Sequence, residues 1–111
     1  MGRLRISDID AMKEGESRKI SYKRDGVEME GFVIRFRGRL HAWENRCRHL
    51  PLPLDYGDGR FFSPDGMHLV CATHGAVYEP DTGLCIQGPC AGLGLKPLQA
   101  EWVDGDLVVE T

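Results

Sequence analysis

Two short motifs, each with one cysteine and one histidine, constrain this chain more than any other feature. Cys47-Arg48-His49 has the spacing C-x-H, and Cys71-Ala72-Thr73-His74 has the spacing C-x-x-H. Two soft sulfur ligands and two imidazoles suit a metal centre. The mirrored pairs therefore predict two loops that close on one metal site.

Length and charge narrow the class of protein. The chain has 111 residues, enough for one domain with a modest core. Its net charge of -3 and scattered basic residues argue against nucleic acid or an anionic membrane surface as partner. No apolar run approaches the roughly 20 residues of a membrane helix, and residues 1–4 do not lead into a signal peptide. We therefore expect a cytoplasmic protein in a reducing compartment.

Short strands separated by glycine and proline turns predict an all-β barrel or sandwich. One helical turn is expected after Ser7. A β-meander over residues 18–44 should deliver the first motif at a strand end, and glycines and prolines crowd the stretch between the motifs. The predicted strands cover residues 3–7, 18–23, 30–36, 40–44, 67–70, 76–79, 84–86, 98–103 and 107–110.

Several centres could use these ligands. Zinc sites with two cysteines and two histidines are common, but they usually group like ligands together. A four-cysteine iron–sulfur cluster would need Cys85 and Cys90, and the C-x2-C step is missing. Two disulfides would need an oxidising compartment. A [2Fe–2S] cluster with two cysteines on one iron and two histidines on the other would take one of each from each loop.

The two motifs, followed by Tyr78, Asp81-Thr82-Gly83 and Gly88-Pro89, resemble the Rieske iron–sulfur family. Members of the membrane cytochrome bc type carry an additional cysteine in each motif, joined as a disulfide. Leu52 and Thr73 occupy those places here, so this chain is more similar to the soluble ferredoxin type.

The resemblance implies a specific arrangement of the chain. The Rieske fold is all-β: an antiparallel β-sandwich base carries a small cluster-binding subdomain made of the two ligand loops. We therefore expect a single domain over residues 1–111, with the base formed by residues 1–44 and 91–111. The cluster-binding subdomain would cover about residues 45–90, with the Gly88-Pro89 loop covering the cluster from a third side.

The resemblance also implies the ligands. Cys47 and Cys71 would bind the inner iron as thiolates, and His49 and His74 would bind the outer, solvent-near iron through neutral imidazoles. Such a cluster transfers one electron, and no residue of this chain is arranged for bond-making chemistry. We therefore expect an electron carrier rather than an enzyme.

Hydrogen bonds to the sulfurs tune the potential of such a centre. Rieske clusters span about -150 to +300 mV, against about -400 mV for plant-type ferredoxins. The high-potential members use a serine and a tyrosine hydroxyl, and this chain has Ala76 and Tyr78 at those places. We expect a potential between those of members lacking both hydroxyls and the bc type.

The expected function is a ferredoxin that receives electrons from a flavin reductase and passes them to an oxygenase or a related redox enzyme. A small electron-transfer subunit of a nitrite-reductase-like complex is one alternative. A zinc-stabilised interaction module is another, because zinc accepts the same ligand types.

Other conspicuous residues have simpler interpretations. The apolar stretch 50–54 would be either a docking rim or packing beneath the cluster loop. Residues 55–65 are expected to form an extra surface loop. Cys85 and Cys90 are interpreted as small buried residues rather than a reactive pair. The remaining structural assignments are Trp43 and Trp102 to the core, and His41 and His68 to non-ligand positions.

Overall fold

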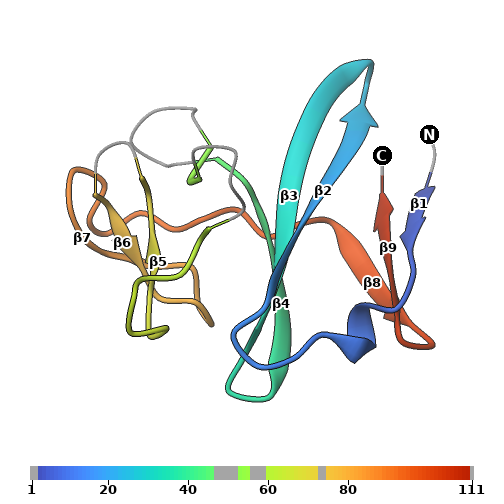
Figure 1. The fold of residues 1–111 in the computed structure, drawn as a ribbon. Helices are drawn as coiled ribbons and strands as arrows, with labels where there is room; N and C mark the ends of the chain where they lie inside the picture. Colours follow the sequence, from blue (N-terminus) through green and yellow to red (C-terminus); the bar gives the residue numbers. More distant parts are fainter. Residues whose placement is uncertain (1–2, 47–52, 56–59, 73–74, 111) are drawn as a thin grey trace.

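A computed structural model describes residues 3–46, 53–55, 60–72 and 75–110 (Figure 1). Within these ranges the chain forms nine strands and one 3₁₀ turn, Ile9–Ala11. The all-β prediction is confirmed. Among the described residues, no helix has the length and apolar character needed to cross a membrane.

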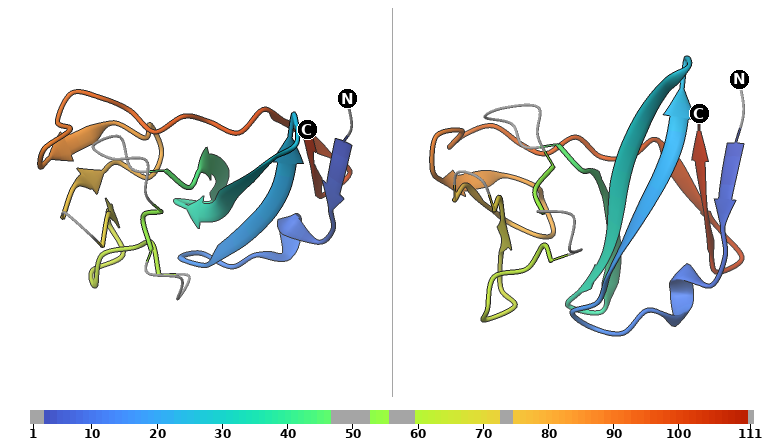
Figure 2. Two further views of the ribbon diagram at one scale, coloured as in Figure 1. Left: turned by 90° about the horizontal axis from the view of Figure 1, so that it is seen from above. Right: turned by 45° about the horizontal axis from the view of Figure 1, so that its top comes forward.

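The strands form three antiparallel sheets of three strands each, arranged side by side in layers (Figures 1 and 2). One outer sheet has the order β1 (Arg3–Ile6), β9 (Asp106–Glu110), β8 (Ala100–Val103). The central sheet is the meander β2 (Ser17–Arg24), β3 (Val27–Phe36), β4 (Arg39–Glu44). The other outer sheet is β5 (Leu69–Val70), β6 (Val77–Tyr78), β7 (Cys85–Gln87).

Strand β3 supplies side chains to two separate cores. Successive side chains of a strand point to opposite faces, so Phe32, Ile34 and Phe36 face the β5–β7 side, where they belong to one buried cluster. Val33 faces the β1–β9–β8 sheet and belongs to the other buried cluster. Burial on both faces explains why residues 32–34 of this strand are three apolar residues in a row instead of an alternation of apolar and polar ones.

The hairpin turns follow from local sequence. Asp25 and Gly26, between β2 and β3, have φ angles of 52° and 79°. Asp104 and Gly105, between β8 and β9, have φ angles of 49° and 81°. Positive φ at both central residues is the type I′ turn that matches strand twist, and Asp-Gly favours it. These dipeptides are therefore the local reason for both hairpins.

Two sequence predictions were wrong in detail. The segment before β5 is not simply a surface loop, because Phe61 is 1% exposed and stacks on Phe32 with ring centroids 4.1 Å apart. Trp102 is 49% exposed instead of buried, because it lies on β8 at the edge of its sheet. Trp43 is buried as predicted.

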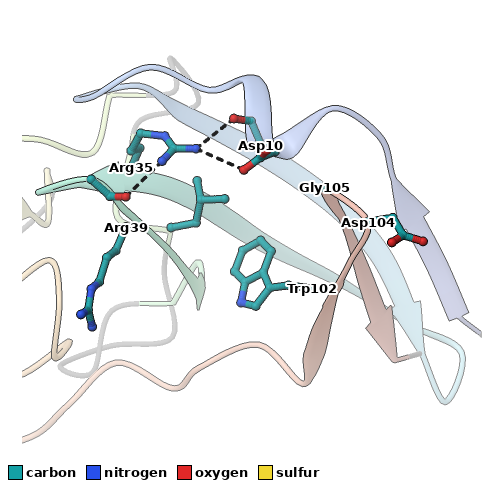
Figure 3. A pocket seen from close by; sticks show the side chains of 8 residues that line it. Asp10, Arg35, Arg39, Trp102, Asp104 and Gly105 are labelled. Atoms are coloured by element: carbon teal, nitrogen blue, oxygen red, sulfur yellow. Dashed lines mark hydrogen bonds and ion pairs between the residues drawn. The ribbon is translucent and has the colours of Figure 1, made fainter.

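The exposed indole of Trp102 lines a groove of about 480 Å³ on the base (Figure 3). Arg35 forms the opposite side, where its guanidinium lies 3.7 Å from the Asp10 carboxylate. Arg35 also donates hydrogen bonds to the backbone oxygens of Met12, Asp10 and Gly38. Because these contacts engage all three guanidinium nitrogens, Arg35 holds the N-terminal turn against β3.

Candidate metal centre

The structure describes one of the four predicted ligands. Cys71 directly follows β5 and has no exposed surface. Cys47, His49 and His74 lie outside the described residues. Within the part of the chain that is described, no three metal-ligating side chains come together. The four-residue ligand set therefore stays a prediction, and the described residues give the framework on both sides of each motif.

The second motif starts and ends on a short hairpin. Strands β5 and β6 pair with Val70 opposite Val77. The Cys71 N–H donates to the Ala76 carbonyl at 2.8 Å, and the Gly75 N–H donates to the Cys71 carbonyl at 2.8 Å. Gly75 has φ of 70°, which glycine adopts without strain. These bonds fix the Cys71 backbone at the end of the hairpin.

A buried asparagine joins the two flanks of the first motif. Asn45, just after β4, accepts a hydrogen bond from the Leu54 N–H through Oδ1 at 2.9 Å. Its Nδ2 donates to Asp55 Oδ1 at 3.0 Å, and Lys19 Nζ donates to Asp55 Oδ2 at 3.1 Å. Asn45 and Asp55 are almost fully buried. Asn45 therefore joins the two ends of the segment that contains Cys47 and His49. We call these ends, Asn45 on one side and residues 54–55 on the other, the neck of the first motif.

The sequence analysis missed Asn45 and Asp55. The available signal is a pair of short polar residues that bracket a predicted loop, since such side chains commonly bond to nearby backbone groups. The same analysis left Leu54 between a docking rim and packing. Leu54 has no exposed surface, so it packs; residues 50–52 lie outside the described ranges.

The neck of the first motif is hydrogen-bonded to the second motif. The Ala72 N–H donates to the Leu54 carbonyl at 2.7 Å. Ala72 follows the cysteine of the second motif, and Leu54 lies a few residues beyond the first motif. The fold thus brings the flanks of both motifs together, as a shared site between two loops requires.

A third segment lies against the second motif. A Cβ built at Gly88 would lie 2.9 Å from the Ala76 Cα, closer than side chains tolerate, and Gly88 has φ of 104°. Only glycine allows this backbone approach without strain. The Gly88-Pro89 segment therefore packs on the residue that follows Gly75. Its predicted role as a loop that covers the cluster stays a prediction.

The Asp81-Thr82-Gly83 turn has a packing reason. Gly83 has φ of 75°, and a Cβ there would lie 2.9 Å from the Trp43 ring. The Trp43 Nε1–H donates to the Pro80 carbonyl at 3.1 Å. Trp43 therefore joins the β6–β7 turn to the central sheet and sets the position of the small sheet relative to the base.

Two further cysteines lie close together in the buried cluster that contains Cys71. Tyr78 is fully buried, and its Oη lies 3.1 Å from Cys90 Sγ, which lies 3.0 Å from Cys85 Sγ. These residues share one buried cluster with Cys71 and Ala76. The predicted bond from Tyr78 to a cluster sulfur stays a prediction. The contact with Cys90 could not be predicted, because it depends on how the Cys90 loop folds back.

The two other histidines lie on the base side and at the turn before β5. His41 pairs with Ile34 in the β3–β4 register. Burial lowers the pKa of His41, an effect that Asp81 opposes and Arg39 reinforces. The backbone N–H of His68 donates to Ser63 Oγ at 3.2 Å, and the Ser63 N–H donates to the His68 carbonyl at 2.8 Å, across the turn that starts at Ser63.

The sequence profile of the Rieske [2Fe-2S] domain matches residues 3–99. This chain belongs to the Rieske [2Fe-2S] domain family. Its cofactor is accordingly a [2Fe–2S] cluster, which supplies reversible transfer of one electron. The described residues fit that group. Cys71 is fully buried at the end of a hairpin, and a hydrogen bond from Ala72 to Leu54 joins the two motifs.

Solved structures share the fold of this Rieske domain. The ferredoxin of carbazole 1,9a-dioxygenase from Nocardioides aromaticivorans IC177 superposes with a TM-score of 0.66 at 23% identity, over 98% of this chain and 97% of that one. The terminal oxygenase of carbazole 1,9a-dioxygenase from Novosphingobium sp. KA1 gives 0.67 at 18% identity, over 96% of this chain and 29% of that one. The Rieske-like prediction of the fold is confirmed.

A curated relative matches part of the sequence. Oxidoreductase NdmD of Pseudomonas putida is 44% identical over 48 residues, which are 43% of this chain and 7% of that protein. The chain therefore corresponds to a small part of this relative's length.

Proposed function

We propose that this Rieske domain is a ferredoxin that carries one electron between redox enzymes and is not itself a catalyst. Cys47 and Cys71 would bind the inner iron, and His49 and His74 the outer iron. The observation that carries the proposal is the hydrogen bond from the Ala72 N–H to the Leu54 carbonyl, which joins the two motifs. The family profile covers both motifs, because it matches residues 3–99.

The proposed cluster-binding subdomain is about residues 45–90, on a base of residues 1–44 and 91–111. The separate three-stranded sheet β5–β7 supports this division. Cys71 lies in the buried interior of this region. A buried thiolate next to apolar side chains suits the inner iron, because that iron does not need contact with solvent.

The proposed donor is a flavin reductase and the proposed acceptor is an oxygenase, in the cytoplasm. Support for the acceptor comes from similarity of fold. A structure of the complex of reduced oxygenase and oxidized ferredoxin in carbazole 1,9a-dioxygenase contains a chain that superposes with a TM-score of 0.69 at 24% identity, over 96% of this chain and 91% of that one.

A second candidate is an electron-transfer subunit or domain that stays attached to a larger oxidoreductase, as in the nitrite-reductase-like alternative. The observation that favours it is that the same fold forms only 29% of the Novosphingobium oxygenase chain. The two candidates use the same cluster and differ in whether the carrier diffuses.

The first experiment tests the cofactor. Protein purified without oxygen should contain two irons and two sulfides per chain and should show the rhombic, low-g-average EPR signal of a reduced Rieske cluster. Cys47→Ser should lose the cluster, while His68→Gln, a change at a histidine outside the ligand set, should keep it. A colourless protein with one zinc per chain would establish the interaction module instead.

The second experiment separates the two candidates. The tagged chain is expressed at its native level and its lysate is run on a size-exclusion column. A diffusing ferredoxin should elute at the size of its own chain. Stoichiometric elution with a larger oxidoreductase that survives high salt would favour the attached subunit.

A further inference from the structure

The thiols of Cys85 and Cys90 face each other inside the domain. Their sulfur atoms are 3.0 Å apart, and the residues are 1% and 3% exposed. Neither belongs to the proposed ligand set. A disulfide bond is about 2.05 Å long, so the two sulfurs need to approach by only about 1 Å to form one.

The backbone holds this pair in place. Cys85 begins β7, and its N–H donates to the Leu93 carbonyl at 2.7 Å while its carbonyl accepts from the Gly92 N–H at 3.0 Å. The Leu93 N–H in turn donates to the Cys90 carbonyl at 2.9 Å. Gly88 and Gly92 have φ angles of 104° and 93° and turn the chain at both ends of the Cys90 loop. The loop thus folds back on β7.

Polar groups contact both sulfurs. The hydroxyl of Tyr78, a fully buried residue, lies 3.1 Å from Cys90 Sγ, and the Cys85 thiol lies 3.4 Å from the Gln87 carbonyl as a donor. Two small apolar residues would fill the same space without a buried hydroxyl directed at one of them. These contacts are the observation that distinguishes a redox pair from simple packing.

We propose that Cys85 and Cys90 form a reversible dithiol–disulfide couple, a two-electron site in the same buried cluster as Cys71. The oxidant is a small-molecule disulfide. One thiolate attacks it, forming a mixed disulfide and releasing one thiol. The second cysteine then attacks the mixed disulfide, forming the Cys85–Cys90 bond and releasing the second thiol. Two protons and two electrons pass in total to the oxidant, and a dithiol reductant reverses both steps.

Access and reversibility follow from the same loop. Ile86, the residue after Cys85, and Leu93, three residues after Cys90, are 43% and 45% exposed, so a small opening of this segment brings a thiol to solvent. The ring closed between Cys85 and Cys90 is short. A short ring gains little from loop closure, so its disulfide should stay reducible.

The test uses the holoprotein without oxygen. Samples are equilibrated in mixtures of reduced and oxidised glutathione, quenched in acid and labelled with N-ethylmaleimide. All four cysteines should be labelled in the reducing mixtures and two in the oxidising ones, with the mass of two hydrogens lost and unchanged iron content before the quench. Peptide mapping should find Cys85 joined to Cys90, and reduced dithiothreitol should restore four labels.

Variants sharpen the assignment. Cys85→Ser and Cys90→Ser should each abolish the oxidised form, and the wild-type map keeps the test valid if a variant folds poorly. Tyr78→Phe removes the hydroxyl contact that stabilises the Cys90 thiol. The ratio of oxidised to reduced reagent at which half of the Cys85–Cys90 pair is oxidised should therefore fall several-fold.

Four labels in the most oxidising mixture with iron intact, or a link that involves Cys47 or Cys71, would overturn the proposal. The outcome does not depend on whether the chain serves an oxygenase.

Discussion

The base and the small sheet hold their residues in different ways. In the base, β2 and β3 pair over a continuous register from Ser17 opposite Ile34 to Arg24 opposite Val27. In the small sheet, β5 and β6 pair over only two positions, and the β6–β7 register shifts at Val77 and Tyr78. The base is thus secured by long strand pairing, whereas the motif region depends on single hydrogen bonds.

This difference teaches where the cofactor matters for stability. A strand pair with many bonds and a buried face can remain folded without a ligand. A hairpin of two residues per strand is marginal without further contacts. Metal binding contributes folding free energy where the site is not otherwise formed. The cluster should therefore stabilise the region of β5–β7 more than the base.

Removal of the cluster should produce the largest effect. In hydrogen exchange, the amides of Cys71, Ala72 and Gly75 should lose more than tenfold of their protection in the apoprotein, while the β2–β3 amides keep most of theirs. Holoprotein taken through the same buffer without chelator is the control. Equal loss of protection in both regions would show that the domain unfolds as one unit.

Asn45→Ala should have the next largest effect. The change leaves the buried Leu54 N–H without its acceptor and removes a donor from the Asp55 carboxylate. The free energy of unfolding should fall by about 2–3 kcal/mol, measured by urea denaturation of the holoprotein. Thr82→Ala removes a comparable side-chain-to-backbone bond at an exposed site and should cost under about 1 kcal/mol. Equal losses of unfolding free energy in the two variants would contradict the role of Asn45 in joining the ends of the first motif.

Gly88→Ala and Gly66→Ala form a matched pair with positive φ angles of 104° and 72°. At Gly66 the added Cβ meets nothing within 4 Å, so only backbone strain of about 1 kcal/mol is expected. At Gly88 the Cβ would also press on the Ala76 backbone, so the loss should reach about 2–3 kcal/mol. Thermal unfolding of the two variants compares them. If the Gly88 variant were as stable as the Gly66 variant, the Gly88-Pro89 segment would be able to move away from Ala76 at little cost.

Tyr22→Phe should have the smallest effect, and it probes the base. Among the described residues, the buried Tyr22 hydroxyl has no hydrogen-bond partner, and burial raises the pKa of this phenol. Its removal should leave the unfolding free energy within about 0.5 kcal/mol or raise it slightly. A clear loss of stability in urea would reveal a partner for this hydroxyl.

Local patterns predicted the parts of the fold that depend on neighbouring residues. Residues 18–44 were predicted as a β-meander, and β2, β3 and β4 form one there. Residues 67–70 were predicted as a strand, and β5 lies within them. Contacts between distant residues were not predictable in this way. The stacking of Phe61 on Phe32 and the edge position of Trp102 depend on how separate segments pack, which no local pattern encodes. Asn45 and Asp55 bracket a predicted loop, but that pattern does not say that Asn45 binds the Leu54 N–H.

The most direct test of the cluster assignment counts histidine nitrogens on the reduced iron. The holoprotein is prepared with ¹⁵N-labelled histidine, reduced, and measured by electron–nuclear double resonance. Two strongly coupled ¹⁵N nuclei are expected, and one should disappear in each of His49→Cys and His74→Cys, while His41→Gln leaves both. A cluster with no coupled histidine nitrogen would contradict the account.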